Sequence, residues 1–216
     1  MRTLRINLLG NFRLHYGDEM ITSINTPRLQ SLLAYLLLHR QAPQSRHHVA
    51  FQFWPDSSEK QAHTNLRKLL FQLRNALPDA DQFLHQDHLT VQWRSNAPAN
   101  LDIAELAQAL ARCRTANGKL GAPVTRADLA QVVALYQGAL LPSCFDEWIL
   151  PIRQQLHREV IHVLEQLVNL AEHQREYQAG IRYAQHLLGL DPLHEAGYRQ
   201  LMQLHALNGD RTAALH

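Results

Sequence analysis

The chain has 216 residues, a net charge of +2 and two cysteines, which is typical of a globular protein with one large domain or two small ones. Two isolated cysteines exclude a disulfide-stapled scaffold, and no apolar run is long enough to span a membrane, so we expect a cytoplasmic protein. The charge is unevenly distributed: residues 27–77 hold seven Lys and Arg against two Asp and Glu, whereas residues 101–216 hold ten against twelve. The positive surplus in the first half is what a nucleic-acid-binding surface requires.

Short strands are expected at the N-terminus, where apolar residues alternate over residues 4–8 and 12–16 and glycine-containing turns follow each stretch. A helix should then run from Pro27 to about His39, because Thr26 can cap it and proline suits a first helical position. Ser45 is expected to cap a second helix. Trp54 should end it, since the residue before a proline disfavours helical backbone.

The third helix, expected within residues 56–77, is the most informative stretch. Asp56, Ser57 and Ser58 can each cap its first turn. Five leucines at helical spacing form its apolar face: Leu66, Leu69, Leu70, Leu73 and Leu77. The opposite face carries cations and amides and no acid after the first turn, a pattern that suits the major groove of DNA. An ordinary amphipathic helix with a solvated polar face is the alternative that this helix alone leaves open.

Eight residues are our candidates for DNA contacts. Six of them lie on the third helix: Thr64, Arg67, Lys68, Gln72, Arg74 and Asn75. The other two, Arg46 and His47, begin the second helix, where backbone N–H groups can bind a phosphate, although simple surface exposure explains them equally well. Phe71 falls on the same polar face of the third helix, and we expect it to pack beneath the hairpin that follows.

A hairpin is expected over residues 83–93, with Gln86, Asp87 and His88 near its tip. The order of strands, three helices and a hairpin is the layout of a winged helix-turn-helix with an N-terminal sheet, in which the third helix is the recognition helix and the hairpin is the wing. We therefore predict a DNA-binding domain over residues 1–96, followed by a polar linker within residues 94–100.

Residues 101–216 are expected to be helical throughout, with a Gly/Pro loop at residues 115–124 and a long helix at roughly 152–174. Residues 170–181 match residues 204–215 at an offset of 34, which is the period of tetratricopeptide-type helical hairpins. Since each such repeat needs a neighbour to bury its apolar face, we expect this all-α domain to be truncated at its C-terminus.

Sequence signs of catalysis and of metal binding are missing. We find no Walker-type glycine loop, no Gly-x-Ser-x-Gly and no His-Glu-x-x-His. Among the 14 histidines, the pairs His47-His48 and His85…His88 come nearest to a metal site, but neither has carboxylate or thiolate partners at ligand spacing. We therefore predict that the protein is not an enzyme and that it has no cofactor and no bound metal.

Short motifs recur through both halves in a characteristic order. In the first half they are Leu8-Leu9-Gly10, Leu32-Leu33-Ala34-Tyr35-Leu36-Leu37, Trp54-Pro55-Asp56, Asn65-Leu66-Arg67 and Leu73-Arg74 with Leu77. In the second half they are Leu135-Tyr136-Gln137-Gly138, Leu140-Leu141-Pro142, Trp148 before Arg153, Asp191-Pro192 with Glu195, and Leu201-Met202. In this order and spacing the whole chain resembles the SARP-type bacterial transcriptional activators, which join an OmpR-like DNA-binding domain to a bacterial transcriptional activation domain (BTAD).

The resemblance implies a mainly α protein with small β elements, in which an N-terminal winged helix-turn-helix is followed by an all-α tetratricopeptide-like domain over residues 101–216. It also implies an activator that binds repeated promoter sites in double-stranded DNA, compatible with a homodimer, and that recruits RNA polymerase holoenzyme at the nucleoid. One departure concerns the wing: the family usually has a Gly-Tyr pair there, whereas this chain has Asp87-His88-Leu89 and lacks Lys or Arg at the tip. His85 and His88 would substitute for a cation only weakly near neutral pH.

A protein-interaction scaffold is the competing interpretation. Its tetratricopeptide part would bind a protein partner, and its winged domain would bind protein rather than DNA. The positive surplus around the third helix argues against this interpretation.

Overall fold

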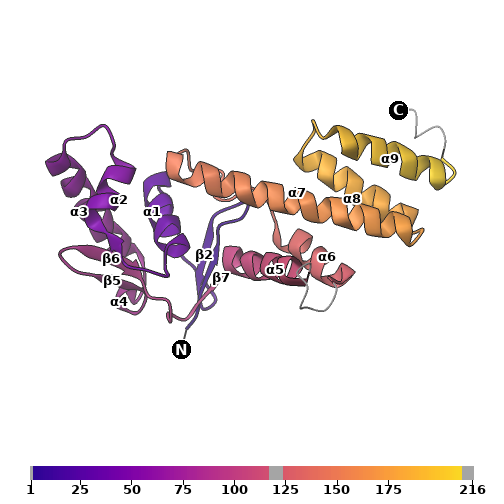
Figure 1. Ribbon diagram of the computed structural model, residues 1–216. Coiled ribbons are helices and arrows are strands. Elements are labelled where there is room, and N and C mark those ends of the chain that lie inside the picture. Colours follow the sequence, from indigo (N-terminus) through magenta and orange to yellow (C-terminus); the bar gives the residue numbers. More distant parts are fainter. Residues whose placement is uncertain (1, 117–123, 211–216) are drawn as a thin grey trace. The chain divides into compact units, whose positions relative to one another are not determined.

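The structure is a computed structural model that describes residues 2–116 and 124–210 (Figure 1). The described strands are β1 (Leu4–Asn7), β2 (Arg13–Tyr16), β3 (Glu19–Met20), β4 (Gln44–Ser45), β5 (Leu84–Gln86), β6 (Thr90–Trp93) and β7 (Ala99–Leu101). The described helices are α1 (Pro27–Leu38), α2 (Arg46–Phe53), α3 (Glu59–Ala76), α4 (Ala80–Phe83), α5 (Asp102–Ala116), α6 (Arg126–Leu135), α7 (Leu150–His173), α8 (Tyr177–Leu190) and α9 (Glu195–Leu207), with a single 3₁₀ turn, η1 (Glu147–Ile149), before α7.

Side-chain caps begin the helices of the first half, as the sequence predicts. The Thr26 hydroxyl accepts a hydrogen bond from the Leu29 N–H, and the Ser58 hydroxyl accepts one from the Gln61 N–H. Ser45 likewise caps α2 by accepting from a backbone N–H in its first turn. Each cap satisfies one of the backbone donors that a helix start leaves without a partner, which is why these short polar residues fix the helix boundaries.

The first half of the chain forms two small sheets. One has the strand order β3-β2-β1-β7 and the other has the order β4-β6-β5. The pairing of β7 with β1 is parallel and sets Ile6 opposite Leu101. The prediction of a polar linker over residues 94–100 is therefore wrong at its C-terminal end. Ala99 and Asn100 belong to β7, which pairs with β1 near the N-terminus.

The chain divides into two compact units, each described by itself. The first contains residues 1–103 together with residues 138–152, and the second contains residues 104–137 and 153–216. The sequence places the boundary between the two domains at residues 97–100. The observed division is different because residues 138–152 belong to the first unit. There the Gly10 N–H donates to the Ala139 carbonyl at 3.0 Å, and the Leu141 N–H donates to the Leu8 carbonyl at 2.7 Å.

A polar anchor and an aromatic cluster hold this returning segment. The carboxylate of Asp146 accepts hydrogen bonds from Arg28, at 2.5 Å, and from the hydroxyl of Ser31, which is only 1% exposed. The ring of Trp148 packs edge-on against Tyr35, with 5.2 Å between the ring centroids. Residues 138–152 thus complete the core that α1 presents.

The second unit is helical in all its described elements. Thr125 and Asp128 form a reciprocal capping box at the start of α6. Helices α8 and α9 pack through small residues, since a side chain at Gly180 would meet Leu204 at 3.1 Å. The rest of the second repeat copy, residues 211–215, and most of the loop expected at residues 115–124 lie outside the described residues. Within the described residues, no helix is long and apolar enough to cross a membrane.

Candidate nucleic-acid interface

Helix α3 has the two faces that its sequence predicts. All five leucines of the expected apolar face are buried, and Ala62 is buried with them. Leucines at this spacing fix the rotation of the helix, because turning it would expose them to water. The opposite face is consequently directed to solvent.

The six candidate residues on α3 are all exposed: Thr64, Arg67, Lys68, Gln72, Arg74 and Asn75. The hydroxyl of Thr64 donates to the carbonyl of Lys60 at 2.8 Å, so it is partly engaged by its own helix. Among the described residues, the side chains of Lys68, Gln72 and Asn75 have no hydrogen-bond or ion-pair partner. These cation and amide groups are therefore available to a ligand, which is the state that base contacts require.

Arg74 is placed differently from its neighbours. Its guanidinium forms an ion pair with Asp81 on α4, with 2.5 Å between nitrogen and oxygen. A ligand would have to compete with that carboxylate. Arg74 thus offers less free positive charge than Lys68, a distinction that the sequence spacing does not reveal.

Arg46 joins the start of α2 to the wing. Its backbone N–H donates to the Leu89 carbonyl at 2.9 Å, and its guanidinium donates to the Asp87 carbonyl at 3.0 Å. The backbone donor proposed for a phosphate is therefore already satisfied at this residue. Burial lowers the pKa of Arg46, and the positive charge of Arg67 lowers it further. The two cations form a concentration of positive charge between α3 and the wing.

The wing is the hairpin of β5 and β6, and an acid holds its turn. The carboxylate of Asp87 accepts from the Leu89 and Thr90 N–H groups and from the Thr90 hydroxyl. These bonds, with those from Thr90 first, hold the pKa of Asp87 below its usual value. Hydrogen bonds within the turn thus stabilise the negative charge of Asp87. The tip of the wing has no Lys or Arg of its own, but the guanidinium of Arg46 lies beside it.

Phe71 is 64% exposed, so the prediction that it packs beneath the wing is wrong. At about 100° per residue, it shares one stripe of α3 with Thr64, Lys68 and Asn75. A large apolar ring therefore lies in the middle of the polar face. Its position can be anticipated from the helical wheel, but its exposure depends on where the wing packs.

His47 differs from a simple surface residue. Its Nε2 lies 3.6 Å from a carboxylate oxygen of Glu59, in the first turn of α3. Its ring packs against Phe51, with 4.7 Å between the centroids. His47 therefore bridges α2 and α3, in addition to being a candidate for a phosphate contact.

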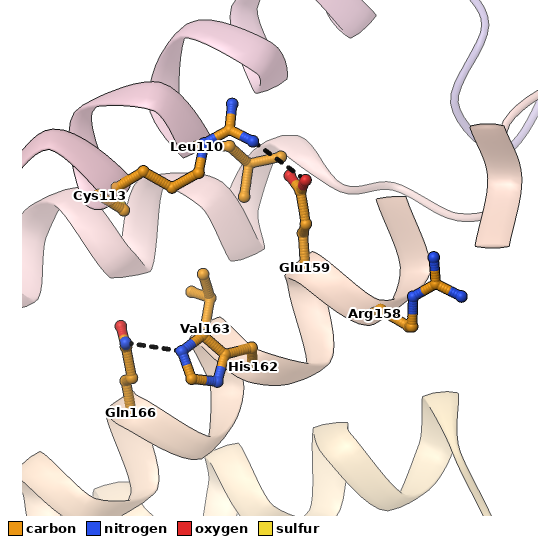
Figure 2. Close-up of a pocket in the computed structure, with 8 residues that line it drawn as sticks. Leu110, Cys113, Arg158, Glu159, His162, Val163 and Gln166 are labelled. Atoms are coloured by element: carbon orange, nitrogen blue, oxygen red, sulfur yellow. Dashed lines mark hydrogen bonds and ion pairs between the residues drawn. The ribbon is translucent and has the colours of Figure 1, made fainter. Parts of the chain in front are cut away.

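A cavity of about 400 Å³ lies in the second unit, between α5 and α7 (Figure 2). Leu110 and Val163 point toward one another across it, and Arg114 forms an ion pair with Glu159 at 3.1 Å. Burial raises the pKa of the Cys113 thiol, which keeps this thiol neutral and a poor nucleophile. The cavity is an apolar hollow with an ion pair at its rim.

The fold combines a winged helix-turn-helix with tetratricopeptide-like helices, which is the architecture of the SARP-type bacterial transcriptional regulators. The family model described as "Bacterial transcriptional activator domain" (BTAD) matches residues 101–216, more than half of the chain. The chain belongs to this family.

Among solved structures, the chain is similar to that of Mycobacterium tuberculosis EmbR in complex with a low-affinity phosphopeptide. The TM-score is 0.73 and the sequence identity is 18%, over 100% of this chain and 57% of the EmbR chain. At this identity the likeness shows the fold alone, and this chain spans little more than half the length of that one. A search of curated proteins found no significant match.

Proposed function

We propose that this regulator binds double-stranded DNA with α3 in the major groove and the β5–β6 wing beside it. The observation that carries the proposal is the free polar face of α3. Lys68, Gln72 and Asn75 are exposed and unpaired among the described residues, on a helix whose other face is buried core. Amide groups can pair with adenine, and a lysine can contact guanine or a phosphate.

The flanking cations support the same proposal. Arg67 lies on the edge of the α3 face, and Arg46 reaches the wing turn close to it. Cations on either side of a recognition helix would meet the two phosphate strands that border a groove. His47 is less suited to a phosphate than proposed from the sequence, because Glu59 faces it.

Family membership supports a wider role. We propose an activator that recognises repeated promoter sites, compatible with a homodimer on DNA, and that recruits RNA polymerase holoenzyme at the nucleoid in the cytoplasm. The bacterial transcriptional activator domain is the part of the chain on which this role rests. The protomer arrangement would be set by the spacing of the DNA repeats.

Selection of randomised duplexes with the purified chain tests the DNA-binding proposal. The wild type should enrich a repeated motif, and a Lys68→Ala/Gln72→Ala double variant should lose this enrichment. Arg199→Ala is the matched control: it removes a cation from an exposed position on α9 in the second unit and should leave the selection unchanged.

The salt dependence of binding separates the competing functions. A DNA-binding protein loses affinity steeply as salt rises because binding releases counterions, and each phosphate contact contributes about 0.9 to the logarithmic slope. Failure of the wild type to enrich any motif, even at low salt, would reject DNA binding and favour the protein-interaction scaffold.

A further inference from the structure

Two histidines and a glutamate from different helices converge where α2 meets α3. Within the described residues, His47, Glu59 and His63 each offer one ligand atom, and these three atoms lie within 4.8 Å of one another. The His47 Nε2 is 3.6 Å from a Glu59 carboxylate oxygen, and the His63 Nε2 is 4.0 Å from the same oxygen. Both imidazoles therefore direct the same ring nitrogen toward one carboxylate.

The local structure places the three groups together for a physical reason. Glu59 and His63 are four residues apart on α3, so they project from the same side of the helix. His47 reaches them from the first turn of α2, and its ring is supported by Phe51 on the following turn. Two ligands on one helix and a third on a packed neighbour make a site whose backbone is already fixed.

The donor set suits a borderline metal ion. Two imidazole nitrogens and one carboxylate oxygen, with a water in the fourth position, form a tetrahedral zinc site of the open, three-ligand kind, with bonds of about 2.0–2.2 Å. Such bonds set neighbouring ligand atoms about 3.3 Å apart, by tetrahedral geometry. The distances of 3.6 and 4.0 Å between the ring nitrogens and the Glu59 oxygen are only slightly longer. Glu59 and His47 are exposed, so small side-chain rotations suffice to close the site.

We propose that His47, Glu59 and His63 form a zinc site that clamps α2 to α3. In the sequence, the adjacent pair His47-His48 has no carboxylate at ligand spacing, so no metal site is expected there. The fold supplies that carboxylate from the next helix. Only His47 of the pair faces it, whereas His48 lines a separate hollow with Arg28 and Phe145.

Calorimetric titration of the full chain with zinc chloride tests the proposal, in a buffer without chelating components. The wild type should bind one zinc ion at this site, with higher affinity than at any other site on the chain. His47→Ala and His63→Ala should each weaken this binding at least tenfold, and Glu59→Gln should also weaken it while keeping the side-chain shape. His48→Ala, the adjacent histidine, is the matched control and should bind as the wild type does.

Thermal unfolding provides a second readout. A ligand that binds only the folded state at 100 times its dissociation constant should raise the Tm of a chain of this size by roughly 5–10 °C. Zinc should raise the Tm of the wild type and of His48→Ala, and should leave the Tm of Glu59→Gln nearly unchanged. Variants that match the wild type in the absence of zinc exclude a folding defect as the cause.

The proposal is overturned if the wild type binds no zinc at about 100 μM, or if His47→Ala and His63→Ala bind it as the wild type does. Equal losses in His48→Ala and His47→Ala would also overturn it, because they would indicate diffuse binding by surface histidines. None of these measurements involves DNA, so the zinc site can fail while DNA binding succeeds, and the reverse.

Discussion

Phe71, which is 64% exposed, bears on DNA recognition because it lies in the middle of the polar face of α3. A single exposed apolar side chain is common on a protein surface, but this ring lies among the polar groups that are proposed to contact DNA. In a major groove, the apolar group available to it is the 5-methyl group of thymine. The neighbouring amide and cationic groups of α3 would bind base edges and phosphates, and Phe71 would add recognition of one A·T pair.

Replacing thymine by deoxyuridine at each position of the selected site tests this role, because the change removes only the methyl group. At one position, the wild type should lose about 0.8 kcal/mol of binding free energy, roughly fourfold in affinity, which is the value of one buried carbon. Phe71→Ala should show no further loss at that position. A loss of the same size in the variant would show that another residue contacts the methyl group.

Lys68 and Arg74 should contribute unequally to DNA binding, although both lie on the exposed side of α3. Lys68→Ala is expected to cost about 1–3 kcal/mol if the lysine contacts a base. Arg74→Ala should cost less, because Asp81 already engages the guanidinium. Fluorescence anisotropy with a selected duplex would measure both losses. In the same assay Asp81→Asn should strengthen binding, since it frees Arg74; weaker binding in Asp81→Asn would contradict this account.

At the scale of elements, the wing depends on the ionised form of Asp87. Its pKa lies below the usual 3.8 because the charged carboxylate accepts three hydrogen bonds across the turn. A lowered pKa in the folded state means that the contribution is complete above about pH 4. It is lost as the pH falls through the lowered value, when the carboxylate is protonated. The wing should therefore be ordered at neutral pH and should loosen first in acid.

Amide hydrogen exchange of Thr90 measures this directly. Asp87→Ala should speed exchange at neutral pH, because the backbone donor loses its acceptor. His88→Ala, at the exposed neighbouring position, should leave exchange unchanged. Equal protection of Thr90 in the wild type and in Asp87→Ala would show that β6 is held by its strand pairing alone.

The carboxylate of Asp146 is the polar anchor of the returning segment, beside its backbone hydrogen bonds and the ring of Trp148. Asp146→Ala removes the partner of a buried hydroxyl, Ser31, and of the Arg28 guanidinium. Leaving a buried polar group unsatisfied costs about 1–3 kcal/mol, so the first unit should unfold more readily by that amount. Urea unfolding measures the change. Glu147→Ala, the exposed neighbouring acid, should differ little from the wild type; equal destabilisation would argue against the anchor.

Elements whose signals are local could be predicted from the sequence. Thr26, Ser45 and Ser58 each cap a helix by accepting a hydrogen bond from a backbone N–H three residues away. The helical spacing of the α3 leucines predicts that they are buried. Strand β7 could not be predicted, because Ala99 pairs with a strand near the N-terminus. Polar residues around a proline have the composition of a linker, and only the distant partner makes them a strand.

The same distinction holds for the candidate site. The polar face of α3 follows from its periodicity, so the exposure of its cations and amides is predicted correctly, whereas the exposure of Phe71 is not. The ion pair of Arg74 with Asp81 and the convergence of His47 on Glu59 depend on how separate helices pack. No spacing rule within one helix reveals such partners. Which of these residues contact DNA stays a prediction.

At the scale of the whole molecule, the first unit is discontinuous in sequence. A fragment that ends at residue 103 lacks residues 138–152, and with them the anchor at Asp146 and the ring of Trp148 against Tyr35. Such a fragment should lose its cooperative thermal transition, or melt well below the full chain, because part of its core is uncovered. A fragment that extends to residue 152 should recover it. Near-UV circular dichroism against temperature compares the three chains, and an unchanged transition in the short fragment would contradict this prediction.

Discontinuity also sets an order of events during synthesis. A ribosome adds about 5–20 residues per second, so roughly 2–10 s pass between the addition of residue 103 and that of residue 152. During this interval α1 has been made but the chain that covers Tyr35 has not. During this time the apolar surface around Tyr35 is exposed to water. The first unit cannot complete its folding, so it cannot bind a ligand with full affinity. A regulator built in this way becomes competent only after its second half has begun to emerge.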